Sequence, residues 1–346
     1  MTNVYLYNNF AELITGNILI SENIRKQQMR QVVCQWLQCE HADISMIAGD
    51  ASFRKYYRAR TSKGSWVLMD APPELEDCSA FIEITDRLRT AGLHAPEIFQ
   101  IDLKNGFLLL EDLGDQQYKP LISLGSDNNC LEPLFKTLEK LAQKVNCKGL
   151  PPYNQSLLQA ELDLFPDWYL SQHLHCPFSV RQQLVWEQVC NLLIKSALQQ
   201  PQVFVHRDFH SCNLMKTKNN NPGIIDYQDA VLGPLSYDLA SLLWDRYISW
   251  PRQQIVQWCE HFHQRFDLDI PLQEWQQQCD WMGLQRNLKV VGIFARLHYR
   301  DQKAGYLQML PRFWSYCLDI LQRYSQFDEL SAILQQDKFQ PGGESS

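Results

Sequence analysis

The sequence predicts an α+β protein with two lobes, a strand-rich N-lobe that carries one helix and a mostly helical C-lobe. Three observations lead to this prediction. Up to about residue 114, alternating apolar residues are separated by turn residues, as in strands. Beyond Gly114, apolar residues recur every three or four positions, as in helices. The 346 residues are also enough for two hydrophobic cores.

The N-lobe is expected over residues 21–114, after a loosely ordered arm formed by residues 1–20. A helix is predicted over 21–37, with Ser21 as its N-cap, because the apolar residues there can share one face. The apolar period then changes. The stretches "ISMIAGDASFRKYYRAR" and "SWVLMDA" are therefore predicted to be strands around a turn.

The rest of the N-lobe is predicted to hold a helix and a hairpin. In "DCSAFIEITDRLRTAGLHAP" (77–96), apolar residues have helical spacing, Gly92 can end the helix and Pro96 follows it. In "EIFQIDLKNGFLLLEDLG" (97–114), the pair Asn105-Gly106 lies between two apolar runs, which indicates a β-hairpin.

The C-lobe is expected over residues 115–340, with a frayed tail beyond it. Its helices are predicted from apolar spacing near residues 131–145, 182–199, 252–266, 275–300 and 312–326. The irregular stretch 201–238 separates the second of these helices from the third.

Composition excludes several classes of protein. A net charge of −7 disfavours a nucleic-acid partner. Eleven cysteines without a CxxC pattern indicate reduced thiols and a cytoplasmic protein. The first residues lack a basic region followed by an apolar run, and no run of about 18 apolar residues follows. We therefore expect neither a secretory signal nor a membrane partner.

The stretch "FVHRDFHSCNLM" (204–215) places polar residues between two apolar runs. Phosphoryl transfer from a nucleoside triphosphate needs a carboxylate that orients the attacking hydroxyl and oxygen ligands for Mg²⁺. Asp208 can be that base and Asn213 a metal ligand. His206 is expected to have a structural role in the loop, and the other histidines form no zinc pattern with a cysteine pair.

A second carboxylate follows in "GIIDYQD", where Asp226 ends an apolar run. The turn residues 219–223 predict a hairpin that returns Asp226 to the side of Asn213. One Asp near an Asn in a loop is usually a turn residue. Three such side chains in this order, each beside a buried strand, are much less common by chance and indicate a metal-assisted reaction.

The motifs "HRDFHSCN", "IIDYQD" and "GPLSYDLASLL" resemble the aminoglycoside phosphotransferase family, over about residues 44–310. This resemblance implies a protein-kinase-like two-lobed fold and the cofactors ATP and Mg²⁺. It also implies that Asp208 is the catalytic base, that Asn213 and Asp226 bind magnesium, and that Asp238 braces the loop. From the sequence alone, Asp238 could equally be a carboxylate at a helix N-terminus.

In such a fold, the N-lobe covers the nucleotide. "GDASFRKYYR" (49–58) would be its phosphate-covering loop, with Gly49 and Ser52 small enough for backbone N–H groups to approach phosphates. "FLLLEDLG" (107–114) would be the hinge that binds adenine, at Glu111, Asp112 and Leu113. Without that context, the two stretches are an ordinary hairpin and an edge strand.

The family usually has a Lys or Arg on the third strand, paired with a helix Glu. Here Met69 in "WVLMD" takes the place of that cation, and Glu83 could fill the acidic role. We hypothesise that Arg54 or Arg58 supplies the missing positive charge.

Further stretches, among them "VLMDAPPELEDCSAF", "GLHAPEI", "ELDLFPDWYL" and "LKVVGIFARLHYRDQKAGYL", resemble the bacterial anomeric kinases of N-acetylmuramate and N-acetylglucosamine. Met69 fits the "VLMDAPP" pattern of this subgroup. The resemblance implies transfer of phosphate to the C1 hydroxyl of an amino sugar in peptidoglycan recycling, which feeds a sugar-1-phosphate uridylyltransferase.

An N-acetyl sugar needs polar groups for its hydroxyls and an aromatic face for its ring. An Arg could also pair with the lactyl carboxylate of muramate. The candidate sugar-binding residues are Glu161, Asp163, Trp168, Asp229, Arg246, Arg296 and Arg300. Each could equally be a packing residue or an exposed helix charge.

Two alternatives remain open at the level of sequence. One is a related kinase for an amino alcohol or an aminoglycoside, although the C-lobe arginines favour a neutral or anionic acceptor. The other is a nucleotide-binding pseudokinase that regulates a partner, as Met69 could suggest. The intact set of Asp208, Asn213 and Asp226 argues against a pseudokinase.

Overall fold

A computed structural model describes residues 23–49, 53–124, 131–266 and 268–342. The chain divides into two compact units. The first comprises the residues up to Thr85 together with Pro96–Gly114, and the second comprises Asp86–Ala95 and the residues from Asp115 onward. The predicted arm, Ser21 and Ser52 lie outside the described residues.

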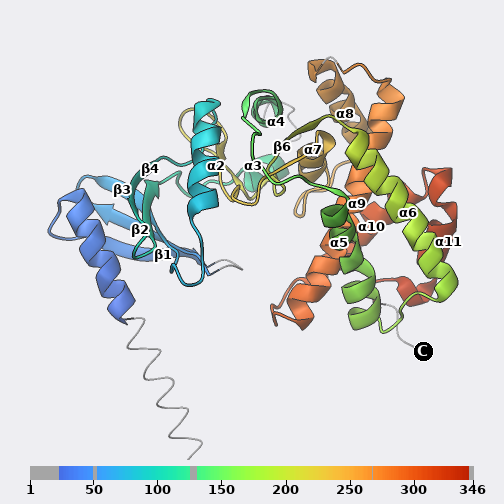
Figure 1. Ribbon diagram of the computed structural model, residues 1–346, viewed down its shortest axis with the longest axis horizontal. Helices are drawn as coiled ribbons and strands as arrows, with labels where there is room; N and C mark the ends of the chain where they lie inside the picture. Colours follow the sequence, from blue (N-terminus) through green and yellow to red (C-terminus); the bar gives the residue numbers. More distant parts are fainter. Residues whose placement is uncertain (1–22, 50–52, 125–130, 267, 343–346) are drawn as a thin grey trace, which may run out of the picture. The chain divides into compact units, whose positions relative to one another are not determined.

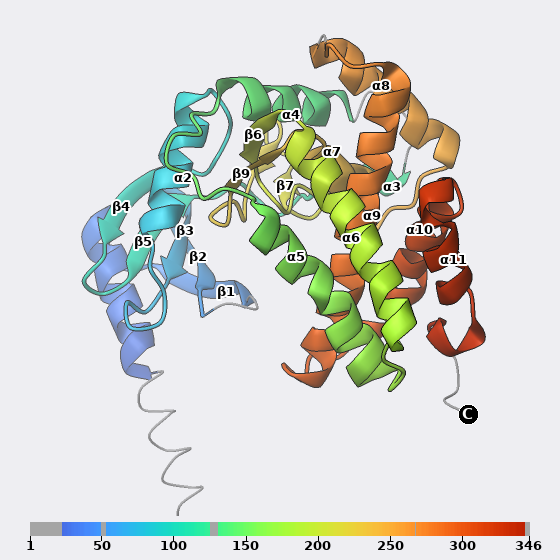
Figure 2. The same ribbon diagram turned by 45° about the vertical axis from the view of Figure 1, so that its right-hand side comes forward.

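The first unit (Figure 1) is built on one antiparallel sheet with the strand order β1-β2-β3-β5-β4, whose five strands are labelled in Figure 2. Its strands are β1 (Asp43–Gly49), β2 (Lys55–Thr61), β3 (Gly64–Asp70), β4 (Ile98–Asp102) and β5 (Phe107–Glu111). A helix over residues 23–37 covers the sheet. Its Met29 and Val33 are buried with Ala59, Leu68 and Phe107, and this cluster forms the core of the unit.

The predicted hairpin at Asn105-Gly106 is confirmed as the connection between β4 and β5. Gly106 has a φ of 70°, and a Cβ atom there would lie 2.0 Å from the carbonyl oxygen of Ala71. The Ala71 N–H donates to the Gly106 carbonyl over 2.8 Å. Only glycine allows this approach, so residue 106 fixes the end of β3 against the hairpin.

The second unit is mostly helical. Its helices are α3 (Tyr118–Leu124), α4 (Glu132–Lys144), α5 (Gln155–Leu164), the π-helix η2 (Phe165–His173), α6 (Val180–Gln199), α7 (Ser236–Leu243), α8 (Arg252–Phe266), α9 (Leu272–Tyr299), α10 (Leu310–Leu321) and α11 (Asp328–Leu334), with 3₁₀ turns η3 (Leu307–Met309), η4 (Ser325–Phe327) and η5 (Asp337–Phe339). The helix α2 (Ser79–Thr90) spans the division between the two units.

Two short two-stranded sheets lie among these helices. They pair β6 (Gln202–Val205) with β9 (Val231–Pro234), and β7 (Leu214–Met215) with β8 (Gly223–Ile224). The predicted hairpin around residues 219–223 is the β7–β8 connection. The irregular stretch 201–238 is therefore two small sheets that hold a loop between β6 and β7.

The 28-residue helix α9 is the centre of the second unit, and α5, α6, α7, α8 and α10 pack against it (Figures 1 and 2). Most of its residues between Trp275 and Ala295 are buried. At Gly292, a Cβ atom would lie 2.3 Å from the carbonyl of Leu164, so glycine lets α9 touch the backbone at the end of α5. No described helix has the length and apolar character that crossing a bilayer requires.

The α+β prediction is confirmed, and the helices expected from apolar spacing are present as α4, α6, α8, α9 and α10. The prediction missed α3, α5, α7, α11 and the π-helix. All eight residues of α7 are buried, so its sequence has no polar face to give a helical period. Pro166 interrupts the pattern where α5 continues into the π-helix.

Candidate active site

The loop that carries Asp208 follows β6 and is held by His206, which is fully buried. The backbone N–H of Asp208 donates to His206 Nδ1 over 3.2 Å, so this nitrogen is the acceptor of the neutral ring. His206 Nε2 then carries the proton and donates to the Ile225 carbonyl over 3.0 Å. One imidazole thus ties the loop to the strand end that precedes Asp226.

Asp238, in the first turn of α7, holds the same loop from the other side. Its carboxylate accepts the backbone N–H groups of His206 (2.6 Å) and Arg207 (3.0 Å). Burial raises the pKa of Asp238 to about 6, although the two N–H groups that it accepts act to lower it. This geometry supports the proposal that His206 and Asp238 are structural residues.

The β7–β8 hairpin brings Asn213 and Asp226 together. Asn213 Nδ2 lies 3.2 Å from Asp226 Oδ2 and 3.0 Å from the Asp208 carbonyl. Both bonds use the amide nitrogen, so the amide oxygen is the atom that could bind a cation. Gln228 donates to the other Asp226 oxygen over 3.1 Å.

Two residues of this region have left-handed backbone conformations: Arg207 has a φ of 75° and Asp226 a φ of 66°. Such conformations are uncommon for residues other than glycine and concentrate at functional sites. These conformations turn the backbone directly before Asp208 and at Asp226 itself. The surrounding hydrogen bonds of the loop hold both conformations in place.

The carboxyl group of Asp208 is set to be ionised. Desolvation acts to raise its pKa, but the positive charges of Lys289 and Arg286 outweigh this and lower the pKa. The side chain also reaches solvent. A deprotonated carboxylate that is open on one side can accept a proton from a bound hydroxyl.

Asn213 and Asp226 fit a magnesium ion, which prefers oxygen ligands and often takes only one or two of them from protein. Within the described ranges, no three or more His, Cys, Asp and Glu side chains are grouped as a larger metal site would require. The donor set therefore suits an ion that completes its shell with phosphate oxygens and water.

Two of the predicted nucleotide-binding residues of the first unit, Arg58 and Asp112, form an ion pair with each other. Arg58 is buried, and its guanidinium donates to both Asp112 oxygens over 2.7 and 3.0 Å and to the Gly114 carbonyl over 3.2 Å. Burial acts to raise the pKa of Asp112, but its bonds with Arg58 and Ser65 outweigh this and lower the pKa. Arg58 therefore braces the predicted hinge.

The other nucleotide-side predictions remain predictions. Arg54 pairs with Glu76 over 3.3 Å, and Met69 is fully buried within β3. Glu83 is exposed on α2, and Gly49 is the last residue of β1. The Glu111 N–H donates to Glu97 within the β4–β5 hairpin, and Leu113 is half-buried.

The sugar-binding candidates lie in different surroundings. The Glu161 carboxylate is buried and bonded within the protein. Asp163 accepts from Gln159 over 2.7 Å, and Trp168 is half-buried on the π-helix. Asp229 is exposed, three residues beyond Asp226.

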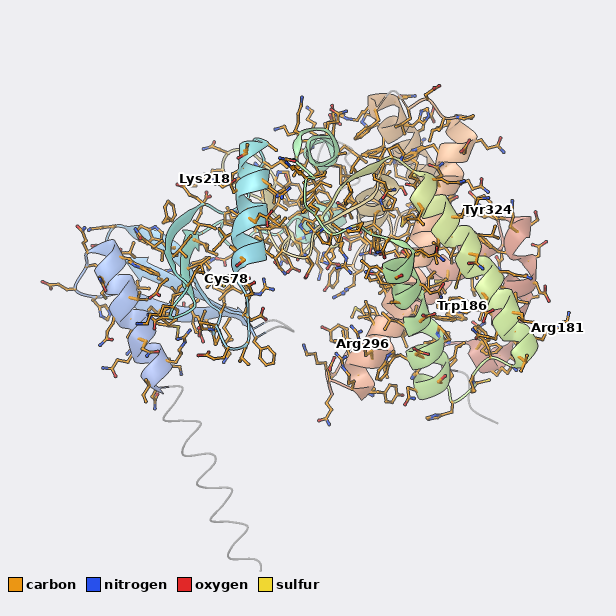
Figure 3. All side chains as sticks on the ribbon, in the orientation of Figure 1. Cys78, Arg181, Trp186, Lys218, Arg296 and Tyr324 are labelled. Carbon is orange, nitrogen blue, oxygen red and sulfur yellow. The ribbon has the colours of Figure 1, made fainter. Side chains whose placement is uncertain are left out.

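The three arginine candidates also differ. Arg246 is half-buried, with its guanidinium 5.1 Å from the ring centre of Phe294. Arg296 is half-buried near the end of α9, where burial and the charge of Arg300 lower its pKa (Figure 3). Arg300 is exposed and pairs with Asp301 over 2.7 Å.

The structure also reveals polar residues near the loop that the sequence analysis missed. Asp245 is buried and accepts the backbone N–H of Ser211 over 2.8 Å. Lys289, in α9, donates to Glu161 over 2.7 Å. A weak signal for Lys289 was present, since this charged residue directly precedes the apolar pair Val290-Val291 in "GLQRNLKVVG".

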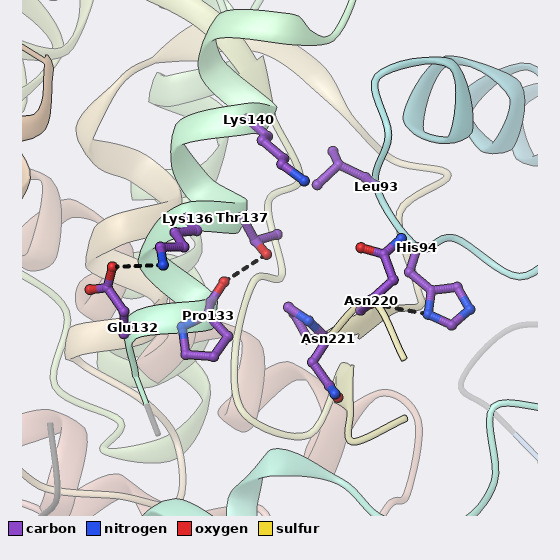
Figure 4. A pocket seen from close by; sticks show the side chains of 10 residues that line it. Leu93, His94, Glu132, Pro133, Lys136, Thr137, Lys140, Asn220 and Asn221 are labelled. Carbon is purple, nitrogen blue, oxygen red and sulfur yellow. Dashed lines mark hydrogen bonds and ion pairs between the residues drawn. The ribbon is translucent and has the colours of Figure 1, made fainter. Parts of the chain in front are cut away.

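A cavity of about 300 Å³ lies at the turn of the β7–β8 hairpin, at the far end from Asn213 and Asp226 (Figure 4). It is lined by Leu93, His94, Glu132, Pro133, Lys136, Thr137, Lys140, Asn220, Asn221 and Pro222. None of the predicted site residues lines it, so this cavity is separate from the group around Asp208.

Comparisons with known proteins identify the family of this chain. Residues 43–273 match the model of the phosphotransferase enzyme family. The N-acetylmuramate/N-acetylglucosamine kinase of Pseudomonas aeruginosa is 41% identical over 86% of this chain and 90% of that protein. The protein of the same name from Neisseria meningitidis is 35% identical over 86% of this chain and 93% of its own.

Two solved structures share the fold. An ethanolamine kinase of Plasmodium vivax has a TM-score of 0.62 at 12% identity and covers 82% of this chain and 84% of its own. Choline kinase LicA from Streptococcus pneumoniae has a TM-score of 0.61 at 12% identity, over 86% of this chain and 99% of its own. The protein-kinase-like two-lobed fold predicted from the sequence is thus confirmed.

Proposed function

Because the chain belongs to the phosphotransferase enzyme family, we propose that it transfers the γ-phosphoryl group of ATP to the anomeric C1 hydroxyl of N-acetylmuramate or N-acetylglucosamine. The observation that carries this proposal is the grouping of Asp208, Asn213 and Asp226 around one loop and one hairpin. The names of the relatives from Pseudomonas and Neisseria supply the acceptor.

In this reaction, the ionised carboxylate of Asp208 accepts the proton of the C1 hydroxyl. The C1 oxygen forms a bond to the γ-phosphorus while the bond to the β–γ bridging oxygen breaks, which releases ADP, and the proton reaches Asp208 late in this step. An anomeric hydroxyl is more acidic than an ordinary alcohol, so Asp208 needs to take the proton only late. Most of the rate enhancement then comes from alignment and charge neutralisation.

Asn213 Oδ1 and the Asp226 carboxylate are the proposed ligands of Mg²⁺, which neutralises phosphate charge when it is bound. The hydrogen bonds from Asn213 to Asp226 and to the Asp208 carbonyl fix the positions of these ligands relative to the base. A shift of the hairpin would therefore move the base and the metal ligands together.

The first unit is proposed to bind the nucleotide. The backbone of Glu111, Asp112 and Leu113 would bond adenine, and the segment from Gly49 to Arg58, which includes Ser52 and Arg54, would cover the phosphates. The ion pair between Arg58 and Asp112 gives the hinge residues a fixed support. Glu83 on α2 stays a candidate for the helix glutamate that pairs with a strand cation in the family.

The second unit is proposed to bind the acceptor. Trp168 offers a half-exposed aromatic face for the sugar ring, and Asp163 and Asp229 offer carboxylates for its hydroxyls. Arg246, Arg296 or Arg300 could pair with the lactyl carboxylate that muramate has and glucosamine lacks. An arginine subsite of this kind would suit a neutral or anionic acceptor better than a cationic one.

The product would be a sugar 1-phosphate, the substrate of a uridylyltransferase in peptidoglycan recycling. We expect the protein to act in the cytoplasm with its cysteines reduced. The cysteines that the structure describes are all free thiols. This agrees with a reducing compartment.

The test is a transfer assay with ATP and Mg²⁺ over a panel of N-acetylmuramate, N-acetylglucosamine, choline, ethanolamine and an aminoglycoside. We expect transfer to one or both amino sugars, and phosphorus NMR should show an anomeric phosphate. Transfer to a C6 hydroxyl, or only to a cationic acceptor, would contradict the proposal. Nucleotide binding with no transfer to any acceptor would favour a pseudokinase instead.

A further inference from the structure

Three charged residues meet at the loop that carries Asp208: the buried Glu161 of α5, the half-buried Arg207 of the loop and the buried Lys289 of α9. We propose that this triad is a positioning device that locks the loop to both helices and so sets the place of Asp208. The inference deepens the proposed function and rests on it. It gives Glu161 a different role from the sugar contact expected from the sequence.

Glu161 is the hub of the triad. Its Oε1 accepts from Lys289 Nζ over 2.7 Å and from Arg207 Nη2 over 2.6 Å. Its Oε2 accepts from the Tyr153 hydroxyl and, over 3.3 Å, from Gln285. Both carboxylate oxygens are therefore occupied inside the protein, and a sugar hydroxyl would have to displace one of these donors.

Lys289 connects the hub to the centre of the unit. Its ammonium group is buried and also donates to the Tyr237 hydroxyl over 3.0 Å, on the helix that carries Asp238. Desolvation acts to lower the pKa of Lys289, but Glu161 outweighs this and raises it. Lys289 therefore keeps its charge and joins α5, α7 and α9.

Arg207 links Glu161 to Asp208, the proposed base, because it binds Glu161 and directly precedes Asp208 in the chain. Its side chain is bound to Glu161, while its backbone N–H is bound to Asp238 and its φ of 75° turns the chain. The residue directly before Asp208 is thus held at both its backbone and its side chain. Any movement of α5 against α9 would be passed to the loop through this residue.

Stability alone does not explain the triad. Two positive charges and one negative charge are removed from much of their water here, and apolar residues of similar size are often as stable as such buried ion groups. Polar networks with directional bonds can, however, select one geometry. Here both Glu161 oxygens are bonded and Lys289 makes two bonds, although Arg207 Nε and Gln285 Oε1 have no partner among the described residues. A loop that must hold a carboxylate in one place benefits from that selection.

The experiment compares Lys289→Met, which removes the charge, with Lys289→Arg, which keeps it. We expect Lys289→Met to lower kcat by about 10-fold to 100-fold, since misplacement of a catalytic group by about 1 Å has effects of that size. Nucleotide affinity and KM for the acceptor should change by less than about 3-fold. Lys289→Arg should recover much of the lost kcat.

A matched control lies on the same helix. Asp280 of α9 is buried and bonded to Arg252, with both distances 2.5 Å, and to Tyr324 over 2.6 Å. Asp280→Asn also breaks a buried ion pair, so it should lower Tm as Lys289→Met does. Because this pair does not contact the loop, kcat should stay unchanged.

If Lys289→Met fails to fold, Tyr237→Phe removes one bond of Lys289 at little cost in volume. It should lower kcat by about 2-fold to 5-fold without changing KM, because one hydrogen bond contributes about 1 kcal/mol. An unchanged kcat in Lys289→Met or Tyr237→Phe would overturn the proposal, as would a rise in KM for the acceptor alone. Absence of transfer by the unmodified protein would instead contradict the proposed function.

Discussion

Two carboxylates, one in each unit, hold functional segments by opposite means. Asp112 of the first unit binds the Arg58 side chain, and these bonds lower its pKa. Asp238 of the second unit binds two backbone N–H groups without a side-chain cation, and burial raises its pKa to about 6. The predicted hinge is thus braced by an ion pair, whereas the loop that carries Asp208 depends on a carboxylate that is costly to keep ionised.

This difference matches the work proposed for the two units. Nucleotide binding in the first unit needs a firm support that tolerates small shifts. Transfer in the second unit needs the base fixed in one place, so the loop is held by several buried groups at once. Changes in the second unit should therefore affect turnover, and changes in the first should affect nucleotide affinity.

The largest effect is expected for Asp208→Asn. It removes the proposed base while keeping the size of the side chain, and transfer should fall by about 1,000-fold or more. Nucleotide affinity, measured by a binding titration, should remain within about 2-fold of the unmodified protein. Turnover close to normal would show that Asp208 is not the base.

Asp238→Asn should have the next largest effect. An amide has one acceptor oxygen, so one of the two backbone N–H groups would lose its partner, at about 2 kcal/mol of the free energy of unfolding. Urea unfolding measures this loss, and kcat should fall more than nucleotide affinity. Equal loss of both would mean that Asp238 supports the whole fold rather than the loop.

Acid pH offers a third test. Burial lowers the pKa of His210 to about 4, although the charges of Asp208 and Asp245 act to raise it. Between about pH 6.5 and pH 4 the unfolded chain binds a proton at this residue and the folded chain does not, so the unmodified protein loses stability as the pH falls. This contribution disappears in His210→Gln.

Urea unfolding of both proteins at pH 7 and pH 4.5 measures the difference. The stability of His210→Gln relative to the unmodified protein should rise by about 2 to 3 kcal/mol as the pH falls. A relative stability that does not depend on pH would show that folding does not lower the pKa of His210. The two proteins must be compared because Asp238 titrates in the same pH range and has the opposite effect on stability. That effect is present in both proteins and cancels in the difference.

The smallest effect is expected in the first unit. Arg58→Ala removes the partner of Asp112, so KM for ATP should rise by about 3-fold to 10-fold while kcat changes little. Arg60→Ala is a matched control, since Arg60 is exposed on the same strand. Arg54→Ala should raise KM for ATP by less than Arg58→Ala. A fall in kcat alone would break the proposed division of work.

The sequence alone predicted the parts of the fold that depend on local rules. The Asn105-Gly106 hairpin and the turn before Gly223 follow from turn chemistry, and α8 matches its predicted bounds, 252–266. The grouping of Asn213 with Asp226 follows from the β7–β8 hairpin, whose turn precedes Gly223. These features require only that neighbouring residues have compatible conformations.

The parts that were missed depend on contacts between distant residues. Glu161 and Lys289 are 128 positions apart, and no local pattern links them. The buried state of Arg58 also depends on Asp112, 54 positions away on another segment. The sequence analysis named Arg58 and Glu161 as candidate site residues. It could not name their partners, because tertiary packing determines these.

The burial of α9 has a consequence for how acceptor choice could change over evolution. A side chain between Trp275 and Ala295 touches protein on most sides, so each substitution there must be matched by others. Half-exposed positions such as Trp168 and Arg246 carry no such restriction. Substitutions that admit a new acceptor should therefore arise first at half-exposed positions of this kind. The sequence of the central helix α9 should change little.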